Sequence, residues 1–437
     1  MTNSHGGPID DVRMRGFARR ETVEAALAWL DAQLHRLPAE TVLLRAAAGR
    51  VLAEAVTSDL DVPGFDRAMM DGFAVVAANT EGASEYNPLP LQVVGEALPG
   101  RAFSGDVQPD QAVRIMTGAP MPHGANAVLP AEWVSAALTL PVAGAVEADA
   151  ISQCAHHARP DDSIQAVAAV SPYKHVGRRG EDVAAGTVVL QRERVLRPQD
   201  LGVLSSVGIV QVCVVRKPRV RLVITGNELL PAGTRPHGCQ VADANGPMLT
   251  ALVERDGGIV DFPGLVPDDR DLILTALQSD ADVVIVSGGS SVGQEDFVPA
   301  LLAQHGELAI HGIAMRPSSP TGMGKLGRRM VFLLPGNPVS CLCAYDFFAG
   351  RAIRALGGRS KKWPYRSLLA TLARKISSPI GRLDYARVLF QDGQLVPISV
   401  GGASVLSSTT RADGFVMVPA DSEGFPPGRE VEVWLYD

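Results

Sequence analysis

Two clusters of small residues in this sequence are of the kind that bind phosphate-like groups. The first runs from Ser287 to Gly293 and holds three glycines and three serines in seven positions, directly after the apolar residues 283–286. The second is Pro335-Gly336-Asn337-Pro338, with Ser340 in the helix expected to follow. Both lie between an expected strand and an expected helix, where free backbone N–H groups and the helix dipole favour an anion. We interpret both clusters as loops that let an oxyanion approach the main chain.

A plainer interpretation of either loop is a tight strand-to-helix turn that needs glycine for a positive φ. Two such loops in one domain make ligand binding the better interpretation. Neither loop matches GxGxxG or GxxxxGK[ST], so NAD binding and P-loop hydrolysis are both disfavoured.

Carboxylates accompany the small residues. Glu228 ends a third loop, residues 225–228, while Asp268 follows an expected strand and Asp296 follows the serine and glycine cluster. An isolated acid is usually a solvated cap, but acids beside an anion pocket suit a Mg²⁺ ion held between carboxylates and phosphate oxygens. Asp243 and Asn245 come just before an expected helix, and we interpret them as its caps.

The elements that must position these loops alternate regularly between residues 218 and 360. Strands are predicted at 219–225, 258–264, 282–289 and 330–337, and helices at 246–255, 269–278, 297–306 and 338–356. Alternating βα units predict a parallel sheet with helices on both faces, whose ligands bind at the carboxyl ends of the strands. The three loops lie at such ends.

The rest of the chain has a different character. Residues 21–37 predict an amphipathic helix, and 41–60 a connecting region with a second helix. Residues 61–182 are mostly β, with Asp71, Thr117 and Asp182 in polar, turn-rich stretches, and strands return after residue 360.

Bulk composition limits the function classes. With 437 residues, 46% of them apolar and 20% charged, the chain fits a soluble protein of several domains. A net charge of −7 argues against a general nucleic-acid surface. The five cysteines include no CxxC pair and are expected to be free thiols in a reducing compartment. We see no secretory signal or membrane span and expect a cytoplasmic protein.

Eight motifs in order resemble the MoeA family, the molybdopterin molybdenumtransferases, to which the gephyrin and Cnx1 E domains are related. They are DVPGFDRAMMDGFAV, RIMTGAPMPHGANAV, GRRGEDVAAGTVV, KPRVRLVITGNELL, VADANGPML, SGGSSVGQEDF, LPGNPVS and GRLDYARV. They cover nearly the whole chain, so the resemblance is specific.

The resemblance implies an elongated α/β multidomain chain. Its centre would be a MogA-like, doubly wound parallel-sheet domain, accompanied by a β-rich domain, a small helical and extended linker domain, and a C-terminal β-barrel-like domain. The expected boundaries are 14–62 with 183–217 for the linker domain, 63–182 for the β-rich domain, 218–360 for the α/β domain and 361–437 for the C-terminal domain.

The resemblance also implies an enzyme. It would insert molybdate into the dithiolene of adenylylated molybdopterin, with Mg²⁺-dependent release of AMP, as a homodimer whose active site lies between the α/β domain of one subunit and the β domain of the other. A molybdopterin adenylyltransferase and molybdoenzyme acceptors are the implied protein partners; no nucleic acid or membrane is expected.

The motifs place the expected site residues. Asp71, Glu228, Asp268 and Asp296 are the catalytic candidates, the last three also as Mg²⁺ ligands, with Asp71 and Thr117 contributed across the dimer. The expected substrate-binding residues are Thr117, Asp182, Ser287, Gly288, Gly289, Ser290, Ser291, Gly293, Arg316, Ser318, Pro335, Gly336, Asn337 and Pro338.

The sequence departs from the family pattern at several charged positions. Asn227 replaces the aspartate of the common family motif TGDEL, and Arg316-Pro317-Ser318-Ser319-Pro320 replaces the basic run KPGKP. Gly312 stands in place of a lysine, Gly177 in place of an arginine, and Ala403 in place of a serine. Each lost charge-assisted hydrogen bond is worth roughly 1.5–3 kcal/mol, although the Arg316 guanidinium suits an oxyanion. A catalytically weakened scaffold protein and a tungstate-preferring insertase therefore stay open as alternatives.

Overall fold

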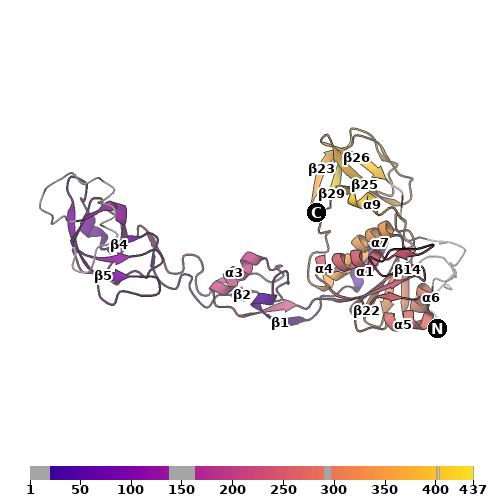
Figure 1. The fold of residues 1–437 in the computed structure, drawn as a ribbon, viewed down its shortest axis with the longest axis horizontal. Coiled ribbons are helices and arrows are strands. Elements are labelled where there is room, and N and C mark those ends of the chain that lie inside the picture. Colours follow the sequence, from indigo (N-terminus) through magenta and orange to yellow (C-terminus); the bar gives the residue numbers. More distant parts are fainter. Residues whose placement is uncertain (1–19, 137–162, 290–296, 400–401, 403, 437) are drawn as a thin grey trace. The chain divides into compact units, whose positions relative to one another are not determined.

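The chain forms two compact units (Figure 1). The computed structural model describes residues 20–136, 163–289, 297–399, 402 and 404–436. Unit 1 comprises Met1–Val42, Gly49–Ala53 and Cys213–Asp437, and unit 2 comprises Leu43–Ala48 and Glu54–Val212. Each unit has its own hydrophobic cores.

The larger part of unit 1 is built on a mixed sheet. Its strands are, in spatial order, β16 (Ile259–Asp261), β13 (Arg219–Thr225), β18 (Val283–Ser287), β22 (Arg329–Leu334), β21 (Gly322–Leu326) and β19 (Glu307–His311), with β17 (Leu265–Val266) beside the end of β13. The first four are mutually parallel, as the alternation of strands and helices predicted. β21 runs antiparallel to both of its neighbours, β22 and β19, so the prediction of a wholly parallel sheet was wrong. Only Gly327 and Arg328 separate β21 from β22, and such a short turn allows only antiparallel pairing.

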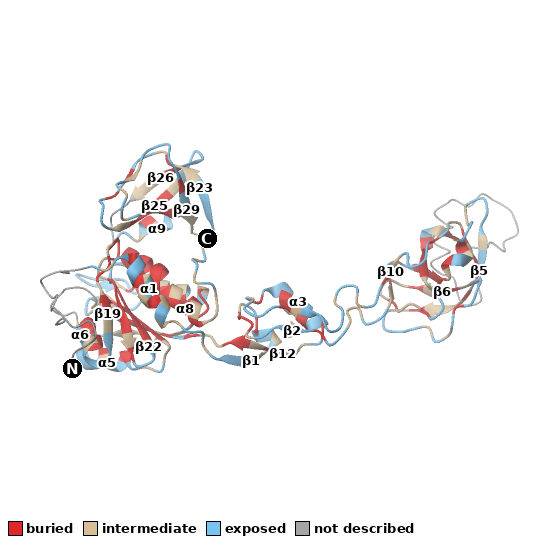
Figure 2. Cartoon of the chain, turned by 180° about the vertical axis from the view of Figure 1, so that it is seen from behind, coloured by how far each residue is buried: buried red, intermediate tan, exposed pale blue. Residues whose placement is uncertain are grey.

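Helices cover both faces of this sheet. One face carries α1 (Val23–Gln33), α4 (Asn245–Arg255), α7 (Pro338–Ala344) and α8 (Gly350–Leu356), and the other carries α5 (Arg270–Leu277) and α6 (Val298–His305). Successive strand residues serve opposite faces: Leu222 packs with the first group, and Val223 with the second. Figure 2 shows the buried residues concentrated in these strands and on the helix sides that meet them.

Two predicted helices end or bend differently from expectation. α1 begins after Thr22, whose side chain accepts a hydrogen bond from Ala25 N at 3.1 Å, but it stops at Gln33 rather than at residue 37. Leu34 and Leu37 still pack against the core from the following extended segment. The helix predicted at 338–356 is interrupted by a π-helical turn, Tyr345–Ala349, between α7 and α8.

A second sheet completes unit 1. Its order is β20 (Met315–Arg316), β25 (Leu383–Gln391), β27 (Gly414–Val418), β29 (Glu430–Leu435) and β23 (Ser367–Thr371), with β26 (Gln394–Ser399) beside β25. Among the strands predicted after residue 360, the apolar runs 385–400, 414–420 and 429–436 correspond to β25 with β26, to β27 and to β29, whereas no such run predicted β23. β20 comes from the segment between β19 and β21, so this edge strand ties the C-terminal sheet to the α/β part.

Unit 2 is strand-rich, as its sequence predicted. Its main sheet has the order β7 (Ala127–Pro130), β4 (Gly72–Val75), β6 (Gln111–Ile115), β5 (Leu89–Ala97), β9 (Ser163–Ala166) and β8 (Val134–Ala136). The second helix predicted within 41–60 is only a single 3₁₀ turn, Leu44–Ala46. Unit 2 has an α-helix later in the chain, α3 (Pro198–Ser206). Across the described parts of both units, no helix has the length and apolar character needed to cross a bilayer.

Candidate active site

A cleft of about 600 Å³ opens where β13, β18 and β22 end, and we call it the loop cleft. Parallel pairing sets Ile224 opposite Ser287, and Ser287 opposite Leu334, so the three loops that follow start at one level. The loop cleft is lined by Thr225, Gly226, Glu228, Asp243, Asn245, Asp268, Ser287, Gly288, Gly289, Gly336, Asn337 and Pro338, among others. The predicted meeting of the three loops is therefore confirmed for their described residues.

Glycine at 288 is required by both backbone conformation and close packing. Its φ is +99°, and a Cβ built there would lie 2.1 Å from the carbonyl oxygen of Thr225. The neighbouring Gly336 also comes close, since its Cβ would stand 3.7 Å from the Gly288 Cα. The turn interpretation and the ligand interpretation thus both apply, because the same glycines that make the turn expose main chain to the cleft.

Asn245 ties two of these loops together. Its Nδ2 donates to Ser287 Oγ at 2.9 Å and to the Gly336 carbonyl oxygen at 2.8 Å. The prediction that Asn245 caps α4 was wrong, because the residue already lies in the first helical turn with its amide directed at β18 and β22. Asp243 does act as a cap, accepting from Gly246 N at 2.9 Å.

Replacing Asn245 by alanine is expected to lower the free energy of unfolding by about 1–3 kcal/mol. The substitution removes the side-chain amide that donates to the Gly336 carbonyl oxygen, and this oxygen is left without that hydrogen bond. Urea unfolding measures the effect. Asn337→Ala is the matched control: this exposed side chain makes no hydrogen bond within the described residues, so its change should stay within about 0.5 kcal/mol. Equal losses in the two variants would contradict a tying role for Asn245.

Two of the three predicted metal-ligand acids line the loop cleft. Asp268 accepts from Thr225 Oγ1 at 2.5 Å and from Asn227 N at 3.0 Å, which holds the loop after β13 in place. Glu228 is exposed, and its side chain has no hydrogen-bond or ion-pair partner within the described part of the chain. Asp296 lies outside the described residues, and the described ones alone contain no ready-made cluster of three metal-binding side chains.

The thiol of Cys341, beside the loop cleft, is unreactive at neutral pH. Cys341 Sγ lies 3.6 Å from Ser287 Oγ, and burial raises the pKa of this thiol to about 12. At neutral pH it stays protonated and is therefore not a nucleophile.

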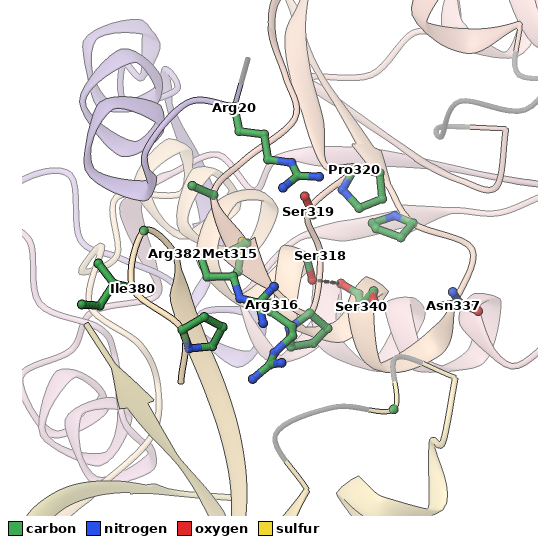
Figure 3. A pocket seen from close by; sticks show the side chains of 16 residues that line it. Arg20, Met315, Arg316, Ser318, Ser319, Pro320, Asn337, Ser340, Ile380 and Arg382 are labelled. Atoms are coloured by element: carbon green, nitrogen blue, oxygen red, sulfur yellow. Dashed lines mark hydrogen bonds between the residues drawn. The ribbon is translucent and has the colours of Figure 1, made fainter. Parts of the chain in front are cut away.

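A second cavity of about 810 Å³ lies next to the first, and we call it the arginine pocket (Figure 3). Its charged lining side chains are Arg20, Arg316 and Arg382, which come from the segment before α1, from β20 and from the turn before β25. Other residues that line it are Ser318, Ser319, Pro335, Asn337 and Ser340. Such a lining suits a small oxyanion, because guanidinium groups form charge-assisted hydrogen bonds to oxygen.

A buried carboxylate orients two of these arginines. Asp384, with no exposed side-chain surface, pairs with Arg316 Nη2, accepts from Arg382 Nε at 3.2 Å and accepts from Ser378 Oγ at 2.9 Å. Arg316 Nε is buried and has no hydrogen-bond partner among the described residues. The guanidinium groups are therefore held in place while part of their donor capacity remains unused.

The two serines at the pocket differ. Ser318 Oγ donates to the Ser340 carbonyl oxygen at 2.6 Å, so its hydroxyl fastens the loop to α7. Ser319 Oγ is buried without a partner in the described part of the chain. Ser318 stays the predicted substrate-binding residue, while Ser319 is the one of the two whose hydroxyl has no partner among the described residues. No local pattern in the sequence distinguishes the two serines.

The predicted substrate-binding residues of unit 1 therefore divide between two cavities. Arg316, Ser318 and Pro335 line the arginine pocket, and Ser287, Gly288, Gly289, Gly336 and Pro338 line the loop cleft. Asn337 lines both, so the cavities share a wall. Ser290, Ser291 and Gly293 lie outside the described residues.

Comparison with known proteins fits this arrangement throughout the chain. Residues 21–208 match the MoeA N-terminal region (domain I and II), 221–355 a probable molybdopterin binding domain, and 370–436 the MoeA C-terminal region (domain IV). The chain is 34% identical to molybdopterin molybdenumtransferase 2 of Mycobacterium tuberculosis over 407 residues, which cover 90% of this chain and 94% of the relative. It is 32% identical to the molybdopterin molybdenumtransferase of Haemophilus influenzae, over 90% and 93% of the two chains.

A solved structure agrees at the level of the whole fold. The crystal structure of a molybdopterin biosynthesis MoeA protein from Pyrococcus horikoshii OT3 superposes with a TM-score of 0.75 and 31% identity, covering 96% of this chain and all of the other. The chain belongs to the MoeA family. Its multidomain fold is that of MoeA.

Two of the three MoeA-family residues predicted in unit 2 contact each other. Asp71 Oδ1 accepts hydrogen bonds from both Thr117 N and Thr117 Oγ1, each at 2.7 Å. Asp182 is exposed, and its backbone N donates to the Val62 carbonyl oxygen at 3.0 Å. The structure thus brings Asp71 and Thr117 together, and their contribution to a site across the dimer stays a prediction.

Two departures from the MoeA pattern have a structural explanation. Asn227 exchanges two hydrogen bonds with Asp268, including Asp268 N to Asn227 Oδ1 at 3.2 Å, so aspartate there would face a second carboxylate. Gly312 has a φ of +94°, which disfavours a lysine. At Gly177 a Cβ would come closest to the ends of the flexible Glu181 and Met69 side chains, so nothing in the structure explains the missing arginine there. Ala403 lies outside the described residues.

Proposed function

We propose that this protein is a molybdopterin molybdenumtransferase of molybdenum cofactor biosynthesis. It inserts molybdate into the dithiolene of adenylylated molybdopterin, and hydrolysis of the adenylyl phosphate bond releases AMP. The proposal rests on family membership and on one observation: two cavities of different chemistry share Asn337. One offers main chain and carboxylates, and the other offers guanidinium groups, which suits a phosphate-bearing pterin beside a tetrahedral oxyanion.

The loop cleft binds the phosphate-bearing substrate in this proposal. Its glycine-rich loops bring Gly288, Gly289 and Gly336 to the lining of the cleft, and the glycine at 288 lets two of the loops approach closely, because a Cβ there would clash with the Thr225 carbonyl oxygen. Asn245 sets the spacing of these loops, and Asp268 fixes the loop after β13. Pre-positioned groups of this kind lower the cost of binding, because little has to be ordered when substrate arrives.

The loop cleft also fits a magnesium ion. Glu228 presents a carboxylate without a partner among the described residues, and Asp268 keeps lone pairs beyond the two hydrogen bonds that it accepts. These two side chains, with Asp296, are the proposed ligands. Bound there, Mg²⁺ would neutralise charge on the phosphoryl oxygens and polarise the bond that breaks.

The arginine pocket receives the molybdate. Arg316 and Arg382 are fixed by Asp384, so their remaining N–H groups are directed before the oxyanion binds. The shared wall at Asn337 brings the oxyanion beside the pterin without requiring either substrate to leave its own cavity.

The remaining expectations belong to the same proposal. The enzyme acts in the cytoplasm as a homodimer, with Asp71 and Thr117 of one subunit supplied to the site of its partner and Asp182 as a further substrate-binding residue. A molybdopterin adenylyltransferase would deliver the substrate, and molybdoenzymes would accept the product.

An AMP-release assay tests the proposed function. The purified full-length protein is mixed with adenylylated molybdopterin and Mg²⁺, and AMP is quantified with and without molybdate. We expect AMP release that depends on molybdate and stops when Mg²⁺ is chelated. Binding of the adenylylated pterin without AMP release would contradict the enzyme and favour a scaffold protein. A parallel reaction with tungstate, which has nearly the same size and charge, would identify a tungstate-preferring insertase by its higher rate.

A further inference from the structure

We propose that Arg20 is a third oxyanion-binding cation, and that it makes the arginine pocket selective for tetrahedral dianions over monoanions. The inference rests on the proposed function for the identity of the natural oxyanion, but on the pocket itself for the charge that it prefers. The residue stands nearly three hundred positions from Arg316, before the first helix, in none of the motifs that carry chemistry.

Backbone hydrogen bonds converge on Ala314 and bring the three arginines together. Ala314 N donates to the Glu21 carbonyl oxygen at 2.8 Å, and Glu21 N donates to the Gly312 carbonyl oxygen at 3.0 Å. On its other side, the Ala314 carbonyl oxygen accepts from Leu383 N at 2.9 Å. Arg20 and Arg382 each precede one of these bonded residues, and Arg316 lies two positions after Ala314. Backbone hydrogen bonds, rather than contacts between flexible side chains, therefore fix the main-chain positions from which the three arginine side chains extend.

Arg20 has its charge available for a ligand. It lines the pocket, and its guanidinium has no ion-pair or hydrogen-bond partner in the described part of the chain. Figure 3 shows it extending over the side of the pocket where Ser319 and Pro320 lie, opposite Arg316 and Arg382. The unpartnered Ser319 hydroxyl is therefore on the Arg20 side, so a bound oxyanion would find a neutral and a charged donor there.

The charge balance of the pocket matches a dianion only when Arg20 is counted. Three guanidinium groups and the paired Asp384 carboxylate leave a net charge of two positive units. Without Arg20 the balance is a single positive unit, because Asp384 already neutralises one of the other two arginines. Electrostatic attraction scales with the charge of the ligand, so Arg20 should contribute about twice as much to a dianion as to a monoanion of the same shape.

Molybdate and perrhenate provide the test, since both are tetrahedral oxyanions but perrhenate carries one negative charge. Isothermal titration of the full-length protein with each ion is compared for wild type, Arg20→Gln, Arg20→Lys and Arg328→Gln. We expect Arg20→Gln to weaken molybdate binding by about tenfold or more and perrhenate binding clearly less. Arg20→Lys should keep most of the preference for molybdate, because it keeps the charge.

Arg328 is the matched control, because it is exposed on the turn between β21 and β22 and does not line the pocket. Its substitution should leave both affinities unchanged. A wild-type molybdate affinity in Arg20→Gln, an equal loss for both ions, or no molybdate binding by the wild-type protein would each overturn the inference. Unchanged thermal unfolding of Arg20→Gln would show that the loss is not a folding defect.

The AMP-release assay separates this inference from the proposed function. Wild-type protein that binds molybdate with the expected Arg20 dependence but releases no AMP would support the dianion pocket and refute the transferase. Protein that releases AMP equally well with and without Arg20, at molybdate concentrations below saturation, would refute the role of Arg20 and leave the transferase intact.

Discussion

Replacing Glu228 by glutamine is expected to reduce the rate of AMP release about a hundredfold or more. The substitution keeps the size of the side chain but removes the negative charge of the one loop-cleft acid that has no partner among the described residues. A metal ion supplies several kcal/mol of charge stabilisation in the transition state, and each 1.36 kcal/mol lost corresponds to about a tenfold lower rate. The measurement is kcat for AMP release at saturating substrates over a range of Mg²⁺ concentrations.

A weakened magnesium site should show a specific pattern. The Glu228→Gln variant should need a higher Mg²⁺ concentration for half-maximal rate and recover part of its activity when Mg²⁺ is raised. The isosteric change Glu254→Gln, at an exposed position of α4 outside the cleft, should leave both quantities unchanged. A wild-type rate and Mg²⁺ requirement in Glu228→Gln would remove this residue from the metal site.

Replacing Asp256 by alanine is expected to destabilise unit 1 by about 3–5 kcal/mol. Its carboxylate has no exposed surface and accepts from Arg354 Nη1 at 2.8 Å, from Tyr345 OH at 3.0 Å and from Arg255 Nη2 at 3.1 Å. Removing it leaves the Arg354 side chain, itself only 4% exposed, as a buried charge without its partner. Urea unfolding of the full-length chain, followed by tryptophan fluorescence, measures the loss.

Asp280 offers a control of the same residue type. It forms an ion pair with Arg219, but its side chain is 90% exposed, so Asp280→Ala should cost less than about 1 kcal/mol. The variant Asp256→Asn, which keeps an acceptor but loses the charge, should fall between the two. Similar losses at positions 256 and 280 would show that the buried network contributes no more than a surface pair.

The strands and loops of the candidate site were largely predictable from local sequence. The strands that became β13, β18 and β22 were recognisable as apolar runs, and the small residues after them mark their ends. Loops that follow neighbouring parallel strands meet at the same edge of the sheet. The need for glycine at position 288 could also be predicted, because a positive φ and a close backbone contact both exclude a side chain.

Contacts between strands and side chains that lie far apart in the sequence could not be predicted in the same way. The prediction missed β19, the antiparallel strand β21 and the edge strand β23, because each is stabilised by a neighbour rather than by a strong pattern of its own. Asn245 was assigned to helix capping because Asp or Asn before a helix usually has that role. Its amide instead reaches Ser287 and Gly336, a choice that depends on how α4 packs against the sheet.

The sequence by itself determined which residue types this protein brings to a phosphate-like ligand, and at which strand ends. Hydrophobic periodicity and glycine requirements act over a few neighbouring residues, so they can be read along the chain. Only the tertiary structure decided that the predicted set divides into two cavities with Asn337 between them, and that Arg20 joins Arg316 and Arg382. Those neighbours are created by hydrogen bonds on either side of Ala314 between segments far apart in sequence. Which such segments pair depends on the packing of the whole unit, and no local pattern records it.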